Sequence, residues 1–248
     1  MNLSYKLDMN SIKDEKRRVE EHAAIANYNG LLVAKSATSY CGDLFRRYMK
    51  TGSVLELGPA EGVMTDLLFP YYEDYTVVDG ADFFVKDILN RHPKIKGYSC
   101  LFEEFKPSVK YDNVVLGHVL EHVDNPVEIL KLTSNWLNDE GVIVAAVPNS
   151  HSIHRQAAVL MGMLESEKQL NERDILNGHR RVYDIEMLKA DFIDAGLRIK
   201  ESGGYWLKPE SNAQIDKNWD INMIEAFMKL GEEYPDIAAE IYVIAEKF

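Results

Sequence analysis

A loop of small residues between two apolar runs carries the most informative chemistry in this sequence of 248 residues. The first run, Val54–Leu57, contains Glu56 and breaks at Gly58 into a turn that ends at Gly62, after which helix-forming residues resume. A strand that feeds a tight turn and then a helix is typical of ligand binding at the carboxyl edge of an open α/β sheet. The second run ends in Asp79, where nucleotide-binding folds place an acid that accepts hydrogen bonds from ribose hydroxyls. Together the two runs predict a nucleotide-like ligand.

Side chains that are able to exchange protons follow the later apolar runs. Histidine titrates close to neutral pH, and it is therefore well suited to act as a general base there. The histidines gather after the runs that end near residues 117 and 147, and again before a helix expected at residues 185–195. The candidate catalytic residues are His118, His122, His154, His179 and Tyr183.

Arginines stand next to these histidines. Arg155 follows His154, and Arg180 and Arg181 follow His179. A guanidinium group pairs bidentately with carboxylate or phosphate. If these arginines converge on one cleft, they would bind an anionic substrate.

The segment His118–His122 also spells H-x-x-E-H, the signature of the inverzincin metallopeptidases. A catalytic zinc site needs both histidines on one face of a helix, a further acidic ligand and an open coordination position. Here the motif begins at the end of an apolar, strand-like run, so we do not expect a zinc peptidase. The sequence leaves the metal content unknown.

The elements that must position these residues alternate between strand-like and helix-like runs. The expected strands cover residues 53–57, 75–78, 96–100, 113–116, 142–147, 197–201 and 241–245. The expected helices cover residues 13–50 with a break at 29–30, then 81–90, 126–137 and 185–195. This alternation predicts an α/β fold with right-handed βαβ units and a mostly parallel, doubly wound sheet. The strands are continuous apolar runs, as expected when helices cover both faces.

Composition restricts the partners. The net charge of −12, from 40 acidic against 28 basic residues, argues against nucleic acid as the main partner. No stretch approaches the roughly 18 uninterrupted apolar residues of a membrane span. The two cysteines, Cys41 and Cys100, cannot form a disulfide framework, so we expect a reducing, cytoplasmic setting.

Four features, in the same order, resemble the class I S-adenosylmethionine (SAM)-dependent methyltransferases. They are a glycine-rich first motif, an acid after the second strand, a fourth strand and the stretch after it, at Glu56–Gly62, Asp79, Tyr111–Leu116 and Leu120–Pro126. His179–Tyr183 and Ala195–Leu197 are similar to the branch of ubiquinone-biosynthesis O-methyltransferases. The resemblance covers about residues 50–200. It implies a Rossmann-like, mostly parallel seven-stranded sheet whose last strand is antiparallel.

The resemblance also implies a domain organisation and a cofactor site. A single domain over residues 1–248 would comprise a helical cap at 1–50, a SAM-binding core at 51–149, and substrate or lid excursions at 150–184 and 203–238. Asp79 would bind the ribose, the loop backbone would pass under the methionyl and ribose parts, and the residues after the third strand would flank the adenine. The implied cofactor residues are Glu56, Gly58, Pro59, Ala60, Gly62, Asp79, Gly80, Leu101, Phe102, Gly117 and His118.

The loop departs from the family pattern at one position. Ala60 stands where the middle glycine is common, and alanine lacks the easy access to positive φ that glycine has. We expect a weakened but intact motif. A NAD(P) dehydrogenase is the nearest structural competitor, but the spacing of Gly58 and Gly62 does not fit the G-x-G-x-x-G fingerprint.

The expected function is therefore transfer of a methyl group from SAM to a small-molecule acceptor, with oxygen favoured as the methylated atom and an anionic substrate suggested by the arginines. A small-molecule N-methyltransferase and a non-catalytic SAM-binding regulatory protein are the alternatives. Neither nucleic acid nor a membrane span is expected as a partner, and a homodimer is left open. The acceptor would be selected by the excursions, where no strong motif identifies it.

Overall fold

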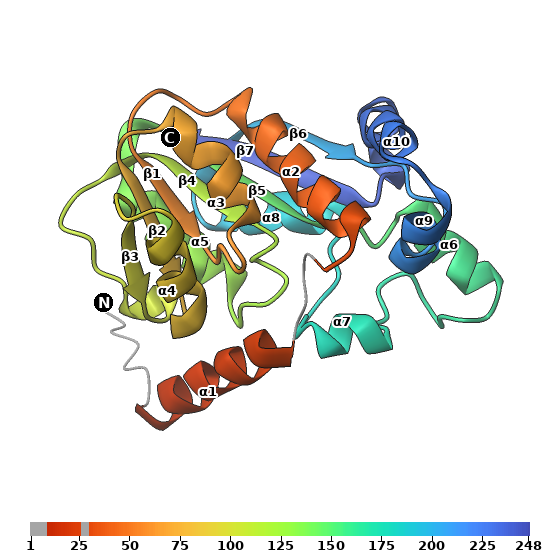
Figure 1. Ribbon diagram of the computed structural model, residues 1–248, viewed down its shortest axis with the longest axis horizontal. Coiled ribbons are helices and arrows are strands. Elements are labelled where there is room, and N and C mark those ends of the chain that lie inside the picture. Colours follow the sequence, from red (N-terminus) through yellow and green to blue (C-terminus); the bar gives the residue numbers. More distant parts are fainter. Residues whose placement is uncertain (1–8, 26–29) are drawn as a thin grey trace.

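A seven-stranded sheet forms the centre of the computed structural model, which describes residues 9–25 and 30–248. Its strands are β1 (Val54–Leu57), β2 (Tyr75–Asp79), β3 (Lys96–Ser99), β4 (Tyr111–Gly117), β5 (Leu137–Pro148), β6 (Leu197–Tyr205) and β7 (Glu240–Lys247). Their order is β3-β2-β1-β4-β5-β7-β6 (Figure 1). β1 to β5 pair in parallel, whereas β7 is antiparallel to both β5 and β6. The predicted fold class, including the antiparallel last strand, is confirmed.

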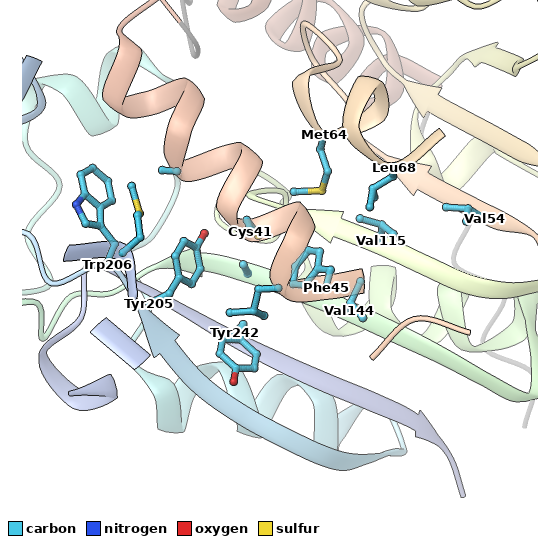
Figure 2. Close-up of a cluster of buried hydrophobic side chains, with 14 of the residues drawn as sticks. Cys41, Phe45, Val54, Met64, Leu68, Val115, Val144, Tyr205, Trp206 and Tyr242 are labelled. Atoms are coloured by element: carbon cyan, nitrogen blue, oxygen red, sulfur yellow. The ribbon is translucent and has the colours of Figure 1, made fainter. Parts of the chain in front are cut away.

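Helices cover both faces of the sheet because the strand residues alternate between two apolar clusters. In β1, Val54 belongs to one cluster, and Leu55 and Leu57 to the other. One cluster packs against α2 (Leu32–Arg46), α3 (Val63–Leu68), α4 (Asp82–Arg91), α9 (Asn212–Asn218) and α10 (Ile221–Glu233). Figure 2 shows its centre, where Phe45 of α2 and Met64 of α3 meet Val115 of β4. The other cluster packs against α5 (Pro126–Trp136) and α8 (Ile185–Asp194).

The N-terminal cap consists of two helices where a broken helix is expected. α1 spans Met9–Ile25, and α2 begins at Leu32. Residues 1–8 and 26–29 of the expected cap lie outside the described residues. In Figure 1, α1 lies below the sheet edge at which the parallel strands end, beside the short helix α7 (Glu172–Leu176).

Both excursions contain helices. The first contains α6 (Ile153–Leu160) and α7, and the second contains α9, α10 and the 3₁₀ turn η3 (Pro235–Ile237). The second starts later than expected, because β6 continues through Gly203 and Gly204, which pair with Tyr242 and Ile241 of β7. Strand pairing thus extends β6 over two glycines, a residue type that strands disfavour. Two further 3₁₀ turns are η1 (Phe69–Tyr71) and η2 (Phe102–Glu104).

The strand order reverses between β1 and β4, which both pair in the middle of the sheet. In open α/β sheets, a crevice forms at the carboxyl ends of the strands at such a switch point. Gly58 follows β1 and Gly117 ends β4, so these two of the predicted cofactor glycines lie at this point. Among the described residues, no helix combines the length and the apolar character required to cross a membrane.

Candidate functional site

A cavity of about 500 Å³ opens at the carboxyl ends of β1, β2 and β4. Its walls come from α1 and α2, the loops after these strands and both excursions. Most predicted site residues line it, namely Glu56, Gly58, Pro59, Ala60, Asp79, Gly80, Leu101, Phe102, Gly117, His118, His122, His154, Arg155 and His179. The lining does not include Gly62, Arg180, Arg181 and Tyr183.

The loop after β1 turns sharply through residues in the left-handed backbone region. Gly58 and Gly62 have φ values of 64° and 77°, and Ala60 has 47°. A Cβ atom on Gly58 would lie 2.9 Å from Cγ2 of Val119, so only glycine fits against that neighbour. The expectation for Ala60 needs correction, because the alanine adopts positive φ despite a cost of about 1 kcal/mol. The loop therefore keeps the glycine-like path.

Asp79 connects this loop to the end of β2. Its Oδ2 accepts a hydrogen bond from the Ala60 amide at 3.3 Å, and its Oδ1 accepts one from the Ala81 amide at 2.8 Å. Burial raises the pKa of Asp79 to about 6, although these backbone bonds act in the opposite direction. At neutral pH the carboxylate is largely ionised, and it lines the cavity beside Gly80. A Cβ on Gly80 would lie 2.8 Å from Cγ1 of Val19, so this glycine lets α1 approach.

Glu56 holds the start of α3 against the sheet. The side chain is buried, and its Oε2 accepts hydrogen bonds from Thr65 Oγ1 at 2.6 Å and from the Tyr75 hydroxyl at 2.8 Å. Burial raises the pKa of Glu56 to about 7, against the effect of these two hydrogen bonds. Glu56 lines the cavity, and its hydrogen bonds also fix the geometry of the loop after β1.

His118 follows β4 in a strained conformation, with φ of 59°. Its Nδ1 lies 3.6 Å from Oε1 of Glu121 and 3.7 Å from Oε2 of Glu240, while its Nε2 lies 3.3 Å from the Tyr205 hydroxyl. Burial lowers the pKa of His118, but Glu240, Cys41 and Glu121 outweigh burial and raise it well above its usual value. The two nearby carboxylates therefore favour the imidazolium form of His118, in which the ring is a donor and a positive charge rather than a general base.

Glu121 and Glu240 are acidic cavity residues that sequence reasoning did not select. Burial raises the pKa of Glu121, but His118, His122 and His179 outweigh it and lower the pKa to about 2. Burial raises the pKa of Glu240, which His118 and Lys208 partly oppose. The H-x-x-E-H match was a signal for Glu121. Glu240 gave none, because it reaches the cavity only through the insertion of β7 beside β5.

His122 and His179 lie together in the cavity wall. Their rings meet edge to face, with centroids 4.7 Å apart. Burial lowers the pKa of His122 to about 4, so its ring is neutral at neutral pH. Ligand atoms of Glu121, His122 and His179 lie within 4.8 Å of one another, a donor set that suits a divalent transition metal. His118 of the H-x-x-E-H segment is not part of this group.

A basic side chain that the sequence patterns did not indicate, Lys208, also lines the cavity. Lys208 lies with its Nζ 4.8 Å from the centre of the Trp206 ring, and burial lowers its pKa to about 8. The charge of Lys208 also acts on His154. Burial, followed by the charges of Lys208 and Arg155, lowers the pKa of His154 to about 3. His154 is consequently neutral across the physiological range.

Arg155 is buried and bound within its own excursion. Its Nε donates to the Glu167 carbonyl at 2.8 Å, its Nη1 pairs with Asp174 Oδ2 at 3.1 Å, and its Nη2 donates to the Gln169 carbonyl. These contacts join α6 to α7 across the intervening loop. The guanidinium is thus used to shape the cavity wall.

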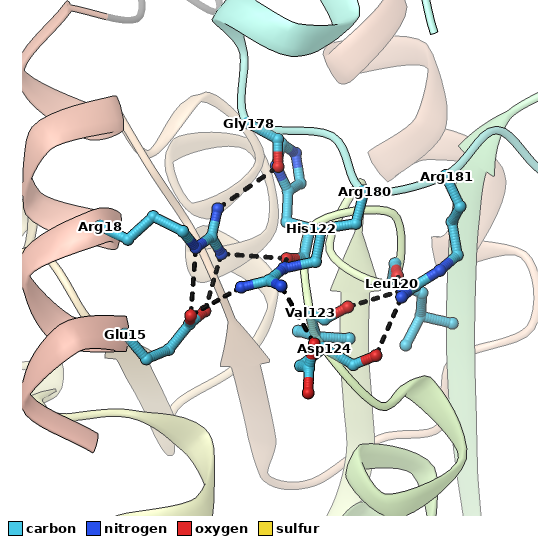
Figure 3. A network of polar contacts seen from close by, with 9 residues as sticks. All are labelled: Glu15, Arg18, Leu120, His122, Val123, Asp124, Gly178, Arg180 and Arg181. Atoms are coloured by element: carbon cyan, nitrogen blue, oxygen red, sulfur yellow. Dashed lines mark hydrogen bonds and ion pairs between the residues drawn. The ribbon is translucent and has the colours of Figure 1, made fainter. Parts of the chain in front are cut away.

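Arg180 and Arg181 bind the loop that follows β4 (Figure 3). Arg181 donates to the carbonyls of Leu120 and Val123 at 2.9 and 2.6 Å and to that of Asp124 at 2.9 Å. Arg180 donates to the His122 carbonyl at 3.0 Å, and its two Nη atoms pair with Asp124 at 3.0 Å and with Glu15 at 2.6 Å. The predicted convergence of these arginines on a substrate therefore has no support in the geometry, because protein oxygens occupy both guanidinium groups.

The same network attaches α1 to the cavity rim. Arg18 pairs with Glu15 at 2.7 Å and donates to the carbonyls of His122 and Gly178 (Figure 3). Since Glu15 also binds Arg180, α1 and residues 178–180 are held together across the rim. Tyr183, a predicted catalytic residue, is instead buried outside the cavity, where its hydroxyl donates to Asp191 at 2.8 Å.

Comparisons with known proteins agree with this arrangement. A family described as a methyltransferase domain matches residues 33–202. A comparison with curated proteins finds no match.

Three similar solved structures each cover most of the chain. N-methyltransferase NodS from Bradyrhizobium japonicum, in complex with S-adenosylhomocysteine (SAH), is 13% identical over 94% of this chain and 98% of that one, with a TM-score of 0.60. An S-adenosylmethionine-dependent methyltransferase from Mesorhizobium loti is 14% identical over 83% and 96%, with a TM-score of 0.60. One from Archaeoglobus fulgidus is 19% identical over 85% and 94%, with a TM-score of 0.56. At such identities the likeness establishes the fold, and the ubiquinone-type branch stays a prediction.

Proposed function

The chain belongs to the methyltransferase-domain family whose pattern spans residues 33–202, and on this premise we propose that it transfers the methyl group of SAM to a small-molecule acceptor. The observation that carries the proposal is one cavity, at the switch point of the sheet, that joins the loop after β1, Asp79 and His118. The site fits the cofactor because the carboxylate of Asp79 is ionised and each of its oxygens accepts only one backbone hydrogen bond. It lies beside a turn of small residues whose backbone a ligand is able to approach closely.

The half of the cavity around β1 and β2 is the proposed cofactor side. Asp79 would accept hydrogen bonds from the ribose hydroxyls, and the backbone at Gly58 and Ala60 would hold the methionyl part. Leu101 and Phe102, which both line the cavity, would flank the adenine. Bound SAM supplies an electrophilic methyl group on a positively charged sulfur.

The half of the cavity around His118 is the proposed acceptor side. Methyl transfer requires in-line alignment and exclusion of water, which α1 and the excursions provide by closing over the strand ends. Burial keeps His122 and His154 neutral, so both are proposed to contact the acceptor as uncharged rings. His118 is proposed to act through its charge, and His179 by positioning His122. Arg155, Arg180 and Arg181 are reassigned to shaping the site.

The finer parts of the proposal concern the acceptor and the setting. The acceptor atom is oxygen or nitrogen, and the anionic substrate loses its main support because the arginines bind protein groups. A reducing cytoplasmic setting fits the free thiols of Cys41 and Cys100. The second candidate is a SAM-binding regulator without turnover, and it is favoured if the protein binds SAM but methylates no small-molecule fraction.

Calorimetry with SAM and SAH tests the proposal. Wild-type protein is expected to bind both, and Asp79→Ala is expected to weaken binding about 30- to 100-fold, which corresponds to the loss of about 2–3 kcal/mol from charge-assisted hydrogen bonds. Asp74→Ala is the matched control, because Asp74 precedes the same strand at its other end and pairs with Lys96 on the surface. Absence of SAM and SAH binding by the wild type would refute the proposed function.

A further inference from the structure

Polar atoms that are buried without a hydrogen-bond partner concentrate in the cavity. Among the described residues, all such side-chain atoms except those of Ser152 and Glu210 belong to residues that line it. The lining residues concerned are Glu121, His154, His179, Trp206, Asn212 and Glu240. Leaving such a group unsatisfied costs about 1–3 kcal/mol, and more when it is charged. Their placement in one cavity points to a ligand that supplies the missing partners.

Most of these atoms are hydrogen-bond acceptors. Both carboxylate oxygens of Glu121, Oε2 of Glu240 and Oδ1 of Asn212 have no donor within hydrogen-bond distance, whereas the Trp206 indole is the one obligatory donor among the unpartnered atoms. Glu121 is 1% exposed and Glu240 is 9% exposed. The Nδ1 of His118 lies between the two carboxylates, at 3.6 and 3.7 Å, and a single N–H cannot bond to both at once.

This excess of acceptors selects among chemical classes of ligand. A carboxylate or phosphate group brings no donor and would be repelled by two buried carboxylates. A hydroxyl brings one donor and no longer has it after methylation. A neutral primary amine brings two N–H donors and a neutral secondary amine brings one, and each keeps at least one N–H as a methylated ammonium. His118 and Lys208 offset the charge of Glu121 and Glu240, so the cavity also tolerates the neutral amine that is the nucleophile.

We propose that the methyl acceptor is a primary or secondary amine whose N–H groups are received by the carboxylates of Glu240 and Glu121. This inference rests on the proposed methyltransferase function and adds the acceptor class. The amine lone pair forms the new N–C bond while the C–S bond breaks, and the electron pair of that bond stays on the sulfur of SAH. The surplus proton of the product ammonium passes to Glu240. Burial of Glu240, which raises its pKa, suits that carboxyl group to accept a proton.

The test uses radiolabelled SAM and matched acceptors on full-length protein. The central set is 2-phenylethylamine, 2-phenylethanol and phenylacetate, which share a skeleton, and it is extended by spermidine, glycine and glucosamine with their hydroxyl or acid counterparts. Label is expected in amines only. Label in a hydroxyl or acid compound without label in any amine overturns the inference, and so does an entire amine panel that stays unlabelled while SAH binds. Failure of SAH binding would instead refute the proposed function itself.

A variant then tests the carboxylate directly. Glu240→Gln is expected to raise the KM of the best amine at least tenfold, while the calorimetric Kd for SAH changes less than threefold. Glu246→Gln is the matched control, since Glu246 lies on the same strand but pairs with Arg198 and Lys200 at the surface. An unchanged KM in Glu240→Gln with an unchanged Tm overturns the inference. Loss of amine methylation on adding EDTA does so too, because it would assign Glu121 to a metal.

Discussion

Arg181→Met gives the sharpest test of the reassigned arginines. The guanidinium of Arg181 donates to three backbone carbonyls, those of Leu120, Val123 and Asp124, in the loop after β4. That loop carries Glu121 and His122 of the cavity wall. Methionine keeps most of the apolar stem and removes every donor, so the substitution isolates the hydrogen bonds.

The size of the effect follows from the exposure of each carbonyl. Leu120 is fully buried, and the Val123 carbonyl is bound at 2.6 Å, whereas Asp124 is exposed and water can replace its bond. Counting about 1.5 kcal/mol for each of the first two bonds and little for the third gives a loss of about 3 kcal/mol. For a domain of this size, that loss lowers Tm by about 6–12 °C.

Thermal melts by circular dichroism and methylation kinetics provide the measurement. Arg181→Met is expected to lower Tm while leaving the acceptor KM within threefold at a temperature where the protein is folded. Arg198→Met is the control, because the exposed pair of Arg198 with Glu246 contributes under about 1 kcal/mol. An unchanged Tm combined with a tenfold higher acceptor KM would show that Arg181 binds substrate, and the reassignment would be abandoned.

The remaining predictions concern the buried carboxyl group of Glu56, Ala60 in the loop after β1, and the close contact of Gly231 with Trp206. Glu56→Gln is expected to stabilise the apo protein at pH 8 by up to about 3 kcal/mol and to have little effect at pH 5, as measured by urea unfolding. The sign follows because the pKa of Glu56 is raised to about 7 in the folded state, so its contribution is lost as pH rises through that value. Ala60→Gly is expected to raise stability by up to about 1 kcal/mol without weakening SAH binding, because positive φ costs glycine nothing; a lower Tm would refute the strain argument. Gly231→Ala is expected to cost about 3 kcal/mol, since its Cβ would lie 2.1 Å from the Trp206 amide nitrogen, whereas Lys229→Ala on the same helix serves as a neutral control.

Local patterns were sufficient to predict most of the residues near the ends of β1 and β2 that line the cavity. The turn from β1 to α3 and the acid at the end of β2 are set by residues close in sequence, and each falls where its strand ends. Parallel pairing of β1 with β2 then brings Asp79 beside Ala60 without any further information. Sequence reasoning succeeds here because the site is built from neighbouring βα connections.

The acceptor side depends on contacts between distant segments, which a single sequence does not reveal. Glu240 reaches His118 only because β7 inserts between β5 and β6, and Lys208 follows β6 into the same cavity. The arginines misled for a related reason. Arg180 and Arg181 donate hydrogen bonds to carbonyl groups of the irregular loop after β4, which need such donors because they are not paired in regular secondary structure. The pattern of charged residues in the sequence does not reveal this role.

Backbone strain links the two halves of the cavity. Among the described residues other than glycine, positive φ occurs at Ala60, His118 and Trp206, and all three line the cavity. Each such residue costs about 1–3 kcal/mol and persists only where the surroundings enforce it, as at sites shaped for a ligand. Ala60 curves the cofactor loop, His118 turns its imidazolium toward Glu121 and Glu240, and Trp206 leads β6 toward Lys208. Histidine and tryptophan rarely adopt left-handed backbone, and their presence in a sequence does not predict it. This concentration of strain therefore appears only in the structure. It is an argument, independent of sequence motifs, that cofactor side and acceptor side form one functional site.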